Sequence, residues 1–350
     1  MGVGAIENQK LTFYFQWFYE HNITDDSYLI NQDFNGTVYA FKEGPLRTTS
    51  KSYLVYNSFF KDFNSRSSLK ISSTSNENKL NVDTCCFSEC SSNERGGSVQ
   101  YSSKGECFQN KVLYLSSIST NNAGQSCHII ITKQAEFNNK LVSSTIANCG
   151  PDIDHQTSST TGTIVLQGGR ILLKDNNITK NQCYYWGGFY VISSAPTNNI
   201  LFCLLTKTNQ SHEILMRYDS DRGNSIYFIR YSNAIENNFY HSIFLTWNVT
   251  LNCSYCSFAN NIFRVWFAYV SSLNDIMYFS NCNLPELRYT NQEGKYTNLI
   301  VVDEKNDFEN DLTYESIIVY KYDDICKTFR NSVLITDRIF LLSLQVFITM

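Results

Sequence analysis

The sequence predicts an all-β protein, a single-stranded parallel β-helix of about nine or more coils. The first observation behind this prediction is an internal repeat. Residues 82–103, VDTCCFSECSSNERGGSVQYSS, align without a gap with residues 173–194, LKDNNITKNQCYYWGGFYVISS. A large apolar residue begins each stretch, another follows five positions later, and both contain Gly-Gly and end in Ser-Ser. Self-similarity over tens of residues is typical of a solenoid.

The second observation is that a template taken from the repeat recurs along the chain. Its starts are Leu54, Val82, Leu113, Leu141, Leu173, Ile200, Arg230, Cys253 and Phe279, 23 to 32 residues apart. Five positions after each start lies a large apolar residue: Phe59, Phe87, Ile118, Ile146, Ile178, Leu205, Ile235, Phe258 and Leu284. Three positions after each start lies Asn, Ser or Cys. We expect the first set to form one interior column and the second to form ladders at the bends.

The third observation is the absence of helical periodicity. Short runs of Val, Ile, Phe and Tyr, such as residues 163–166, 189–192 and 225–230, are separated by Asn, Ser and Gly. This is the composition of short strands and turns. A β-sandwich or a propeller with accidental periodicity is the alternative architecture.

Composition favours one solenoid over several domains. The chain of 350 residues has four prolines and no linker-like segment. We expect a capping region with possible early coils in residues 1–53, the β-helix in 54–290, and C-terminal strands or a cap in 291–350. Charged residues make up 17% of the chain and the net charge is -4, which excludes a general electrostatic role in binding nucleic acid.

A family resemblance adds to this interpretation. The FxxN element occurs literally in residues 258–261, FANN, and in softened form in residues 87–90 and 178–181, where Gly-Gly follows. This order resembles the repeats of the chlamydial polymorphic outer membrane proteins and of a similar protein family in trichomonads, over roughly residues 50–290. The resemblance implies a right-handed parallel β-helix, often exposed on the cell surface and suspected in adhesion. It implies no catalytic residues.

The twelve cysteines have several possible roles. Cys253 and Cys256 form a CxxC pair, but a zinc site would need a second pair nearby, and no thioredoxin-like pattern surrounds this one. We therefore predict no metal and no cofactor, and interpret cysteine as a replacement for Asn or Ser in the ladders. Cys256 and Cys282 occupy the same template position 26 residues apart, so stacking would allow a disulfide between them. Its formation would depend on the compartment.

The ends of the chain leave localisation open. The first ten residues, MGVGAIENQK, lack the pattern of a signal peptide. The last twelve, IFLLSLQVFITM, are apolar but shorter than the roughly 20 residues of a membrane span. They fit a truncated anchor, a capping strand or a broken gene end equally well. A membrane is expected as a partner only if an anchor has been lost.

An enzymatic interpretation requires clustered carboxylates, because many parallel β-helices cleave acidic polysaccharides. The candidates are Asp219, Asp221 and Arg222 in one segment, and Asp152, Asp154 and His155 in another. We predict that both clusters are turn residues. The sequence therefore favours a non-enzymatic surface scaffold that binds a protein or glycan of a host or neighbouring cell. The alternatives are a pectate-lyase-like lyase or hydrolase, and a degenerate family member without function.

Overall fold

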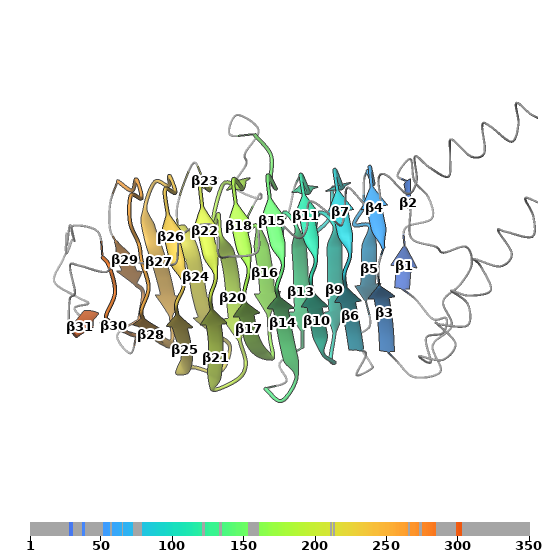
Figure 1. The fold of residues 1–350 in the computed structure, drawn as a ribbon. Coiled ribbons are helices and arrows are strands. Elements are labelled where there is room, and N and C mark those ends of the chain that lie inside the picture. Colours follow the sequence, from blue (N-terminus) through green and yellow to red (C-terminus); the bar gives the residue numbers. More distant parts are fainter. Residues whose placement is uncertain are drawn as a thin grey trace, which may run out of the picture.

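The protein is a right-handed parallel β-solenoid, shown as a computed structural model in Figure 1. The structure describes residues 28–30, 37–38, 52–56, 58–64, 66–72, 79–120, 123–132, 135–152, 161–210, 212, 214–264, 267–272, 275–284 and 299–302. All regular elements among these residues are strands. No described segment is a helix of the length and apolarity needed to cross a membrane.

Three long sheets run the length of the solenoid. Sheet A contains β1 (Tyr28–Ile30), β5 (Leu69–Ser72), β9 (Val99–Ser103), β13 (Cys127–Ile131), β16 (Ile164–Gln167), β20 (Phe189–Ser193), β24 (Ile214–Ser220), β27 (Ser242–Trp247) and β29 (Ala268–Val270). Sheet B contains β2 (Thr37–Val38), β4 (Phe59–Lys61), β7 (Cys86–Ser88), β11 (Leu113–Leu115), β15 (Thr145–Ala147), β18 (Asn177–Thr179), β22 (Leu204–Thr206) and β26 (Asn233–Ile235).

Sheet C is the longest. It contains β3 (Ser52–Tyr56), β6 (Lys79–Asp83), β10 (Cys107–Asn110), β14 (Asn138–Val142), β17 (Arg170–Lys174), β21 (Thr197–Leu201), β25 (Ser225–Arg230), β28 (Val249–Ser254), β30 (Ile276–Ser280) and β31 (Leu299–Val302). Two short pairs bridge sheets B and A: β8 (Ser91–Ser92) with β12 (Ile118–Ser119), and β19 (Gln182–Cys183) with β23 (Asn209–Gln210).

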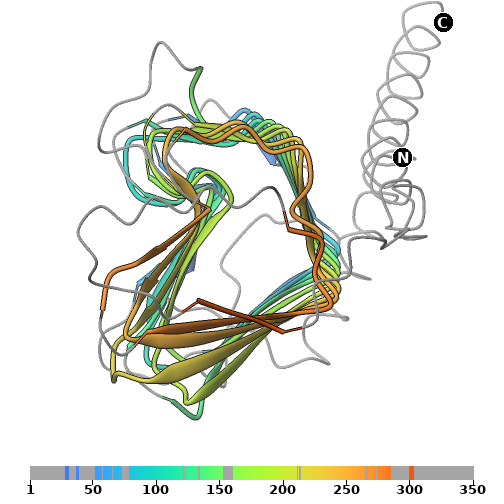
Figure 2. The same ribbon diagram turned by 90° about the vertical axis from the view of Figure 1, so that its left-hand side faces the viewer.

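Each coil passes through sheet C, then sheet B, then sheet A, and the coils superpose when viewed along the stack (Figure 2). Seven turns contain a strand of all three sheets, from β3–β4–β5 to β25–β26–β27, followed by partial turns. The prediction of nine or more coils therefore overestimates the complete turns, because the last two template matches lie where sheet B has ended. Parallel pairing continues to β31, past the expected boundary at residue 290, and most of residues 1–53 and 291–350 lie outside the described part.

The predicted interior column exists, with three corrections. Backbone pairing aligns Phe60, Phe87, Tyr114, Ile146, Ile178, Leu205, Ala234, Phe258 and Leu284. Six of these were predicted, but the assignments of Phe59, Ile118 and Ile235 are wrong. Phe60 replaces Phe59, Tyr114 replaces Ile118, and Ala234 replaces Ile235. The first three rings of the column stack, with the centroids of Phe60 and Phe87 4.6 Å apart and those of Phe87 and Tyr114 5.2 Å apart.

The two bends that flank sheet B carry the ladders of small residues. One ladder is Ser58, Cys85, Val112, Ser144, Asn176, Cys203, Ser232, Cys256 and Cys282, and the other includes Cys90, Ser117, Cys149, Asn181, Thr208, Asn237 and Asn261. Asn181 shows how a ladder works. Its Oδ1 accepts from the backbone N–H of Cys149 at 2.9 Å, and its Nδ2 donates to the carbonyl of Ile146 at 3.0 Å. The amide thus pairs backbone groups that the bend removes from the sheets.

Six of the eleven described cysteines occupy these ladders, as predicted, whereas five lie in strands instead: Cys86, Cys107, Cys127, Cys183 and Cys253. The thiol of Cys90 donates to the carbonyl of Phe60 in the preceding coil at 3.7 Å. Asn181 makes the same type of contact with the carbonyl of Ile146 in the coil before its own. From Cys85 onward, the described residue before each ladder position has a left-handed backbone, for example Glu89 at φ 56° and Lys180 at φ 55°. The left-handed residue turns the chain and presents its own side chain outward.

Candidate functional site

The outward face of sheet A carries two rows of side chains across its last four strands. Alternate residues of a strand point to the same face. Register aligns Tyr190 of β20, Arg217 of β24, Leu245 of β27 and Tyr269 of β29 in one row. Two positions further along the strands, the second row contains Ile192, Asp219 and Trp247.

A bend covers this face in the preceding coils. Gly96, Gly124, Gly162 and Trp186 are equivalent positions, because each glycine N–H donates to the carbonyl just before the next member of the set, at 2.8 to 3.0 Å. All four have positive φ, from 53° to 78°. A Cβ atom built on Gly124 would lie 2.8 Å from Cβ of His128, so the glycine backbone rests directly on the sheet.

Trp186 changes this packing. Beside the glycines, the outward residues His128 and Val165 are only 4% and 1% exposed. Trp186 is a bulky residue in a conformation that favours glycine, which is uncommon and often marks a functional site. Its indole lies over the sheet, 4.4 Å between ring centroids from Tyr190. Further along the sheet, Trp247 on β27 and Tyr269 on β29 are exposed.

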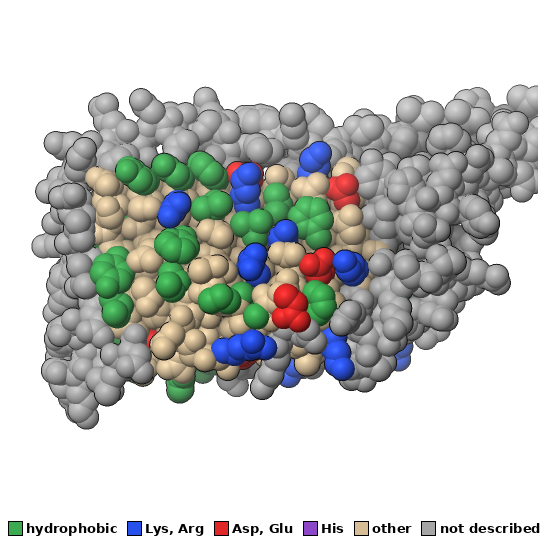
Figure 3. Space-filling view, turned by 90° about the horizontal axis from the view of Figure 1, so that it is seen from below, with side chains coloured by type: hydrophobic (Ala, Val, Ile, Leu, Met, Phe, Trp, Pro, Cys, Tyr) green, Lys and Arg blue, Asp and Glu red, His purple; other side chains and the backbone are tan. Residues whose placement is uncertain are grey.

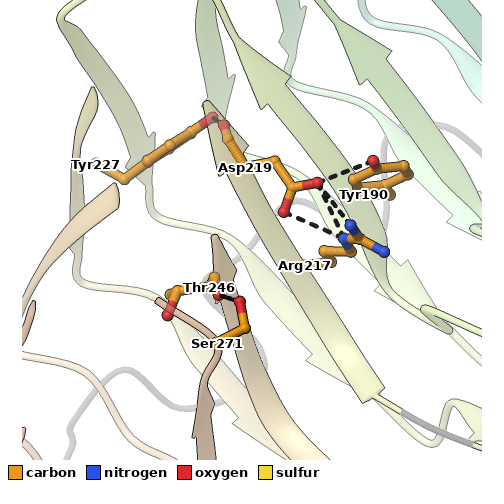
Figure 4. Close-up of polar contacts among 6 residues, drawn as sticks. All are labelled: Tyr190, Arg217, Asp219, Tyr227, Thr246 and Ser271. Atoms are coloured by element: carbon orange, nitrogen blue, oxygen red, sulfur yellow. Dashed lines mark hydrogen bonds and ion pairs between the residues drawn. The ribbon is translucent and has the colours of Figure 1, made fainter. Parts of the chain in front are cut away.

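Arg217 and Asp219 form the polar centre of the face (Figure 4). The guanidinium carbon of Arg217 lies 4.7 Å from the ring centroids of both Trp186 and Tyr190. Arg217 Nη2 is 2.8 Å from Asp219 Oδ2, and its Nε donates to both carboxylate oxygens at 3.1 Å. The Tyr190 hydroxyl donates to Asp219 Oδ2 at 2.9 Å. Tyr227, on the interior side, donates to the Asp219 carbonyl at 2.8 Å.

The electrostatics of this centre are those of a neutralised pair. Burial raises the pKa of the Asp219 carboxyl, and the hydrogen bonds and charge of Arg217 oppose that rise. Burial and the neighbouring Asp219 charge raise the pKa of the Tyr190 hydroxyl. The side chains of Arg217 and Asp219 remain 21% and 12% exposed. The pair therefore offers hydrogen-bonding groups at the surface without a net charge.

Exposed rings surround the pair. Trp247 is 51% exposed, Tyr269 39% and Tyr240 45%. Among the described residues, no ring stacks on Trp247, so its indole faces are not used by other aromatic side chains. The Ser271 hydroxyl donates to the carbonyl of Thr246, which holds the segment after β29 beside the strand that bears Trp247 (Figure 4).

An adjacent ladder borders the face. Tyr184 and His212 stack with centroids 4.4 Å apart, His212 and Tyr240 with centroids 6.1 Å apart, and Arg264 lies 5.3 Å over the Tyr240 ring. We call the outward residues of β20, β24, β27 and β29, with Trp186 and this ladder, the aromatic face. It combines several accessible rings with a few polar groups, which is a typical composition of ligand-binding surfaces.

The predicted carboxylate clusters separate in the structure. The assignment of Asp219 to a turn is wrong, because β24 continues to Ser220 and the Asp219 side chain is buried in the pair with Arg217. Asp221 and Arg222 lie in an exposed bend, as predicted. Asp152 is exposed outside the strands, whereas Asp154 and His155 lie outside the described residues. Within the described part, no three His, Cys, Asp or Glu side chains cluster as metal ligands would.

Cys256 and Cys282 lie in adjacent coils. Ser257 pairs with Asn283 in parallel register, and the N–H of Asn283 donates to the Cys256 carbonyl at 2.8 Å. Both thiols are free and buried. Burial raises the pKa of the Cys256 thiol, and its hydrogen bond to Cys282 lowers the pKa of the Cys282 thiol. Burial also raises the pKa of Cys253, the other member of the CxxC pair, which disfavours a redox role.

We predict that mild oxidation links Cys256 to Cys282, since parallel coils place equivalent residues about 4.8 Å apart. Peptide mapping by mass spectrometry should find this cross-link and no bond between Cys85 and Cys203, which have no cysteine in neighbouring ladder positions. The bond should raise the free energy of unfolding by about 2 kcal/mol. Recovery of Cys256 only as a free thiol after complete oxidation of Cys282 would contradict the prediction.

Sequence reasoning missed Trp186, Tyr190, Arg217 and Trp247. A signal for Arg217 was present, because it lies two residues before the predicted candidate Asp219 in the segment ILMRYDS, so the two side chains share one face of a strand. Comparison with known proteins adds nothing to the site. The chain matches no protein-family model, and neither a curated protein nor a solved structure is detectably similar to it.

Proposed function

We propose that the protein is a non-enzymatic interaction scaffold that binds a neutral glycan on the aromatic face. The observation that carries the proposal is the exposed indole of Trp247 next to the neutralised Arg217–Asp219 pair. One side of a sugar ring presents C–H groups that pack on an aromatic face, and its edge presents hydroxyls that need donors and acceptors. Trp247 and Tyr269 supply the rings, and the ion pair supplies both kinds of polar group.

The shape of the face favours an extended ligand. The accessible rings Trp247 and Tyr269 come from the neighbouring strands β27 and β29, and the bordering ladder runs through successive coils about 4.8 Å apart, so contacts extend along the axis of the solenoid. A chain-like ligand can use several of these contacts at once. The family resemblance supports a role at the cell surface, where such a scaffold would serve adhesion to glycans of a host or neighbouring cell.

The lyase or hydrolase alternative is less well supported. Glycoside hydrolysis generally uses two carboxyl groups on either side of the bond, one of them free to give up a proton. Asp219 has a raised pKa, but its oxygens already accept from Arg217 and Tyr190. Asp221, the nearest carboxylate along the chain, sits in an exposed bend. A binding role requires neither group to react.

Glycan binding can be tested with immobilised neutral and acidic oligosaccharides. The parent chain should bind neutral members, and Trp247→Ala should weaken binding at least about tenfold, as expected for loss of a central aromatic contact. The matched control is Phe108→Ala, because Phe108 also points outward from a strand but lies on sheet C. This variant should bind like the parent.

Other outcomes would overturn the proposal in distinguishable ways. If the aromatic face bound a protein but no glycan, the ligand would be a protein and the glycan proposal would be wrong. Release of sugar ends by the parent, lost in Asp219→Asn or Asp221→Ala, would favour the enzyme. A folded chain that binds nothing would favour a degenerate family member.

A further inference from the structure

A second aromatic feature lies on the opposite side of the solenoid, at the bend between sheets C and B. Phe202, Tyr231 and Tyr255 come from three successive coils and are 38%, 38% and 40% exposed. Their centroids are 5.0 and 5.2 Å apart, and their planes differ by only 8° and 10°. We call these residues the aromatic ridge. The stacked rings cover one another, so mainly their edges project outward.

The choice of residue at the ridge is specific to these coils. From Thr84 to Asn281, each described coil has a left-handed residue at this bend, and outside the ridge it is polar: Thr84, Lys111, Ser143, Asp175 and Asn281. Bulky aromatic side chains are uncommon in this conformation, and they expose apolar surface here. Three in succession form a continuous apolar edge beside sheet C.

The outward face of sheet C next to the ridge is almost uncharged. On β21, β25, β28 and β30, the outward side chains are Thr197, Asn199, Leu201, Ile226, Phe228, Arg230, Thr250, Asn252, Ser254, Ile276, Tyr278 and Ser280. Arg230 is the single charged member, and its guanidinium lies 5.1 Å over the Phe228 ring.

The other half of the same sheet is charged. On β6, β10, β14 and β17, five of the eleven outward residues are ionic: Lys79, Asp83, Lys140, Arg170 and Lys174. Figure 3 shows acidic and basic side chains together on this half, and mostly hydrophobic and uncharged polar ones on the other. Exposed charges keep a sheet face solvated, so the scarcity of charge on the half formed by β21, β25, β28 and β30 marks it as a contact surface.

We propose that the aromatic ridge and the uncharged half of sheet C form a two-fold interface between two copies of the chain. The spacing of the ridge points to this partner. Rings 5.0 to 5.2 Å apart follow the coil repeat, and a second stack of strands presents side chains with the same repeat along the whole contact. Ring edges of one copy can then fit between side chains of the other at every coil.

Charge selects an antiparallel arrangement of the two copies. A two-fold axis across the uncharged half brings that half against itself, and the charged halves extend past the contact on either side. A two-fold axis parallel to the solenoid would instead place the charged halves against each other, where four basic residues and one acidic residue from each copy would repel. The contact involves about 15 residues a side, fewer than the roughly 20 to 30 of a standard interface, so the association should be weak and concentration-dependent.

Sedimentation velocity from about 1 to about 100 µM protein tests the interface, because this range brackets a micromolar dissociation constant. The parent should shift from monomer to dimer with rising concentration. Because the face lacks ion pairs, raising the salt concentration should not weaken the dimer. Tyr231→Lys should raise the dissociation constant at least about thirtyfold, since the charge would be buried at the centre of the contact. Lysine fits the backbone there, because Lys111 occupies the equivalent position at φ 51°.

The control is Tyr240→Lys, at a similarly exposed tyrosine that belongs to the aromatic face and lies outside the proposed dimer interface. It should dimerise like the parent, and equal denaturation midpoints would show that both variants are folded. A parent that stays monomeric over the whole range overturns the proposal. So does a dimer that survives Tyr231→Lys or is lost equally in Tyr240→Lys. Glycan binding by the aromatic face does not depend on any of these outcomes.

Discussion

Ile178→Asp is expected to lower the free energy of unfolding by at least about 4 kcal/mol, enough to unfold a protein of ordinary stability. Ile178 is fully buried, between Ile146 and Leu205 in the interior column. An aspartate there would be either an unpaired buried charge or a protonated acid without hydrogen-bond partners. Neighbouring coils cannot yield easily, because each one stacks directly on the next through all three sheets.

Chemical denaturation followed by circular dichroism measures this effect. The matched control is Lys180→Asp, two residues along the chain, where the side chain is exposed and φ is 55°. Aspartate already occupies such positions, as Asp175 at φ 54° shows. The control should therefore stay within about 0.5 kcal/mol of the parent. Equal denaturation midpoints for Ile178→Asp and the parent would show that the assignment of Ile178 to the interior is wrong.

The fold could be predicted because one column of apolar residues repeats, and its errors have local causes. In the coil of β10 and β11, the position equivalent to Val82 is Gln109, a fully buried polar residue. Its Oε1 accepts from the Tyr114 hydroxyl, so the interior tolerates it. Because the template required an apolar start, it began at Leu113, four residues after Gln109, and therefore selected Ile118 in place of Tyr114. Near Ile235, the column member is the small residue Ala234, and the template took its larger neighbour.

The candidate site was hidden by a single-residue slip. The gapless alignment places Trp186 opposite Arg95, but backbone hydrogen bonds make it equivalent to Gly96. Pairing gives Leu173 as the partner of Val82 and Phe189 as the partner of Val99, so the second stretch is one residue shorter at this bend. A tryptophan at a position that is glycine in the preceding coils would have marked Trp186 as a candidate site residue. Seeing it requires the coil-by-coil register, which loops of unequal length conceal in the sequence.

Asn181→Leu is expected to cost about 3 kcal/mol of stability, although leucine has a similar volume and the position is fully buried. The substitution removes no apolar contact. It leaves the N–H of Cys149 and the carbonyl of Ile146 without the partners that the amide supplies at 2.9 and 3.0 Å. Unpaired buried backbone groups cost about 1 to 3 kcal/mol each. Asn238→Leu, at an exposed asparagine, is the control and should have little effect.

A second variant at the same position separates hydrogen bonding from shape. Asn181→Cys keeps a weak donor toward the Ile146 carbonyl, as Cys90 keeps one toward Phe60. It loses the acceptor for Cys149 and leaves the side chain smaller than leucine. If backbone pairing sets the stability of the ladder, Asn181→Cys should lose less free energy of unfolding than Asn181→Leu despite the smaller volume. The reverse order in denaturant titrations would mean that packing volume controls the bend, and that the asparagine ladder contributes mainly by filling space.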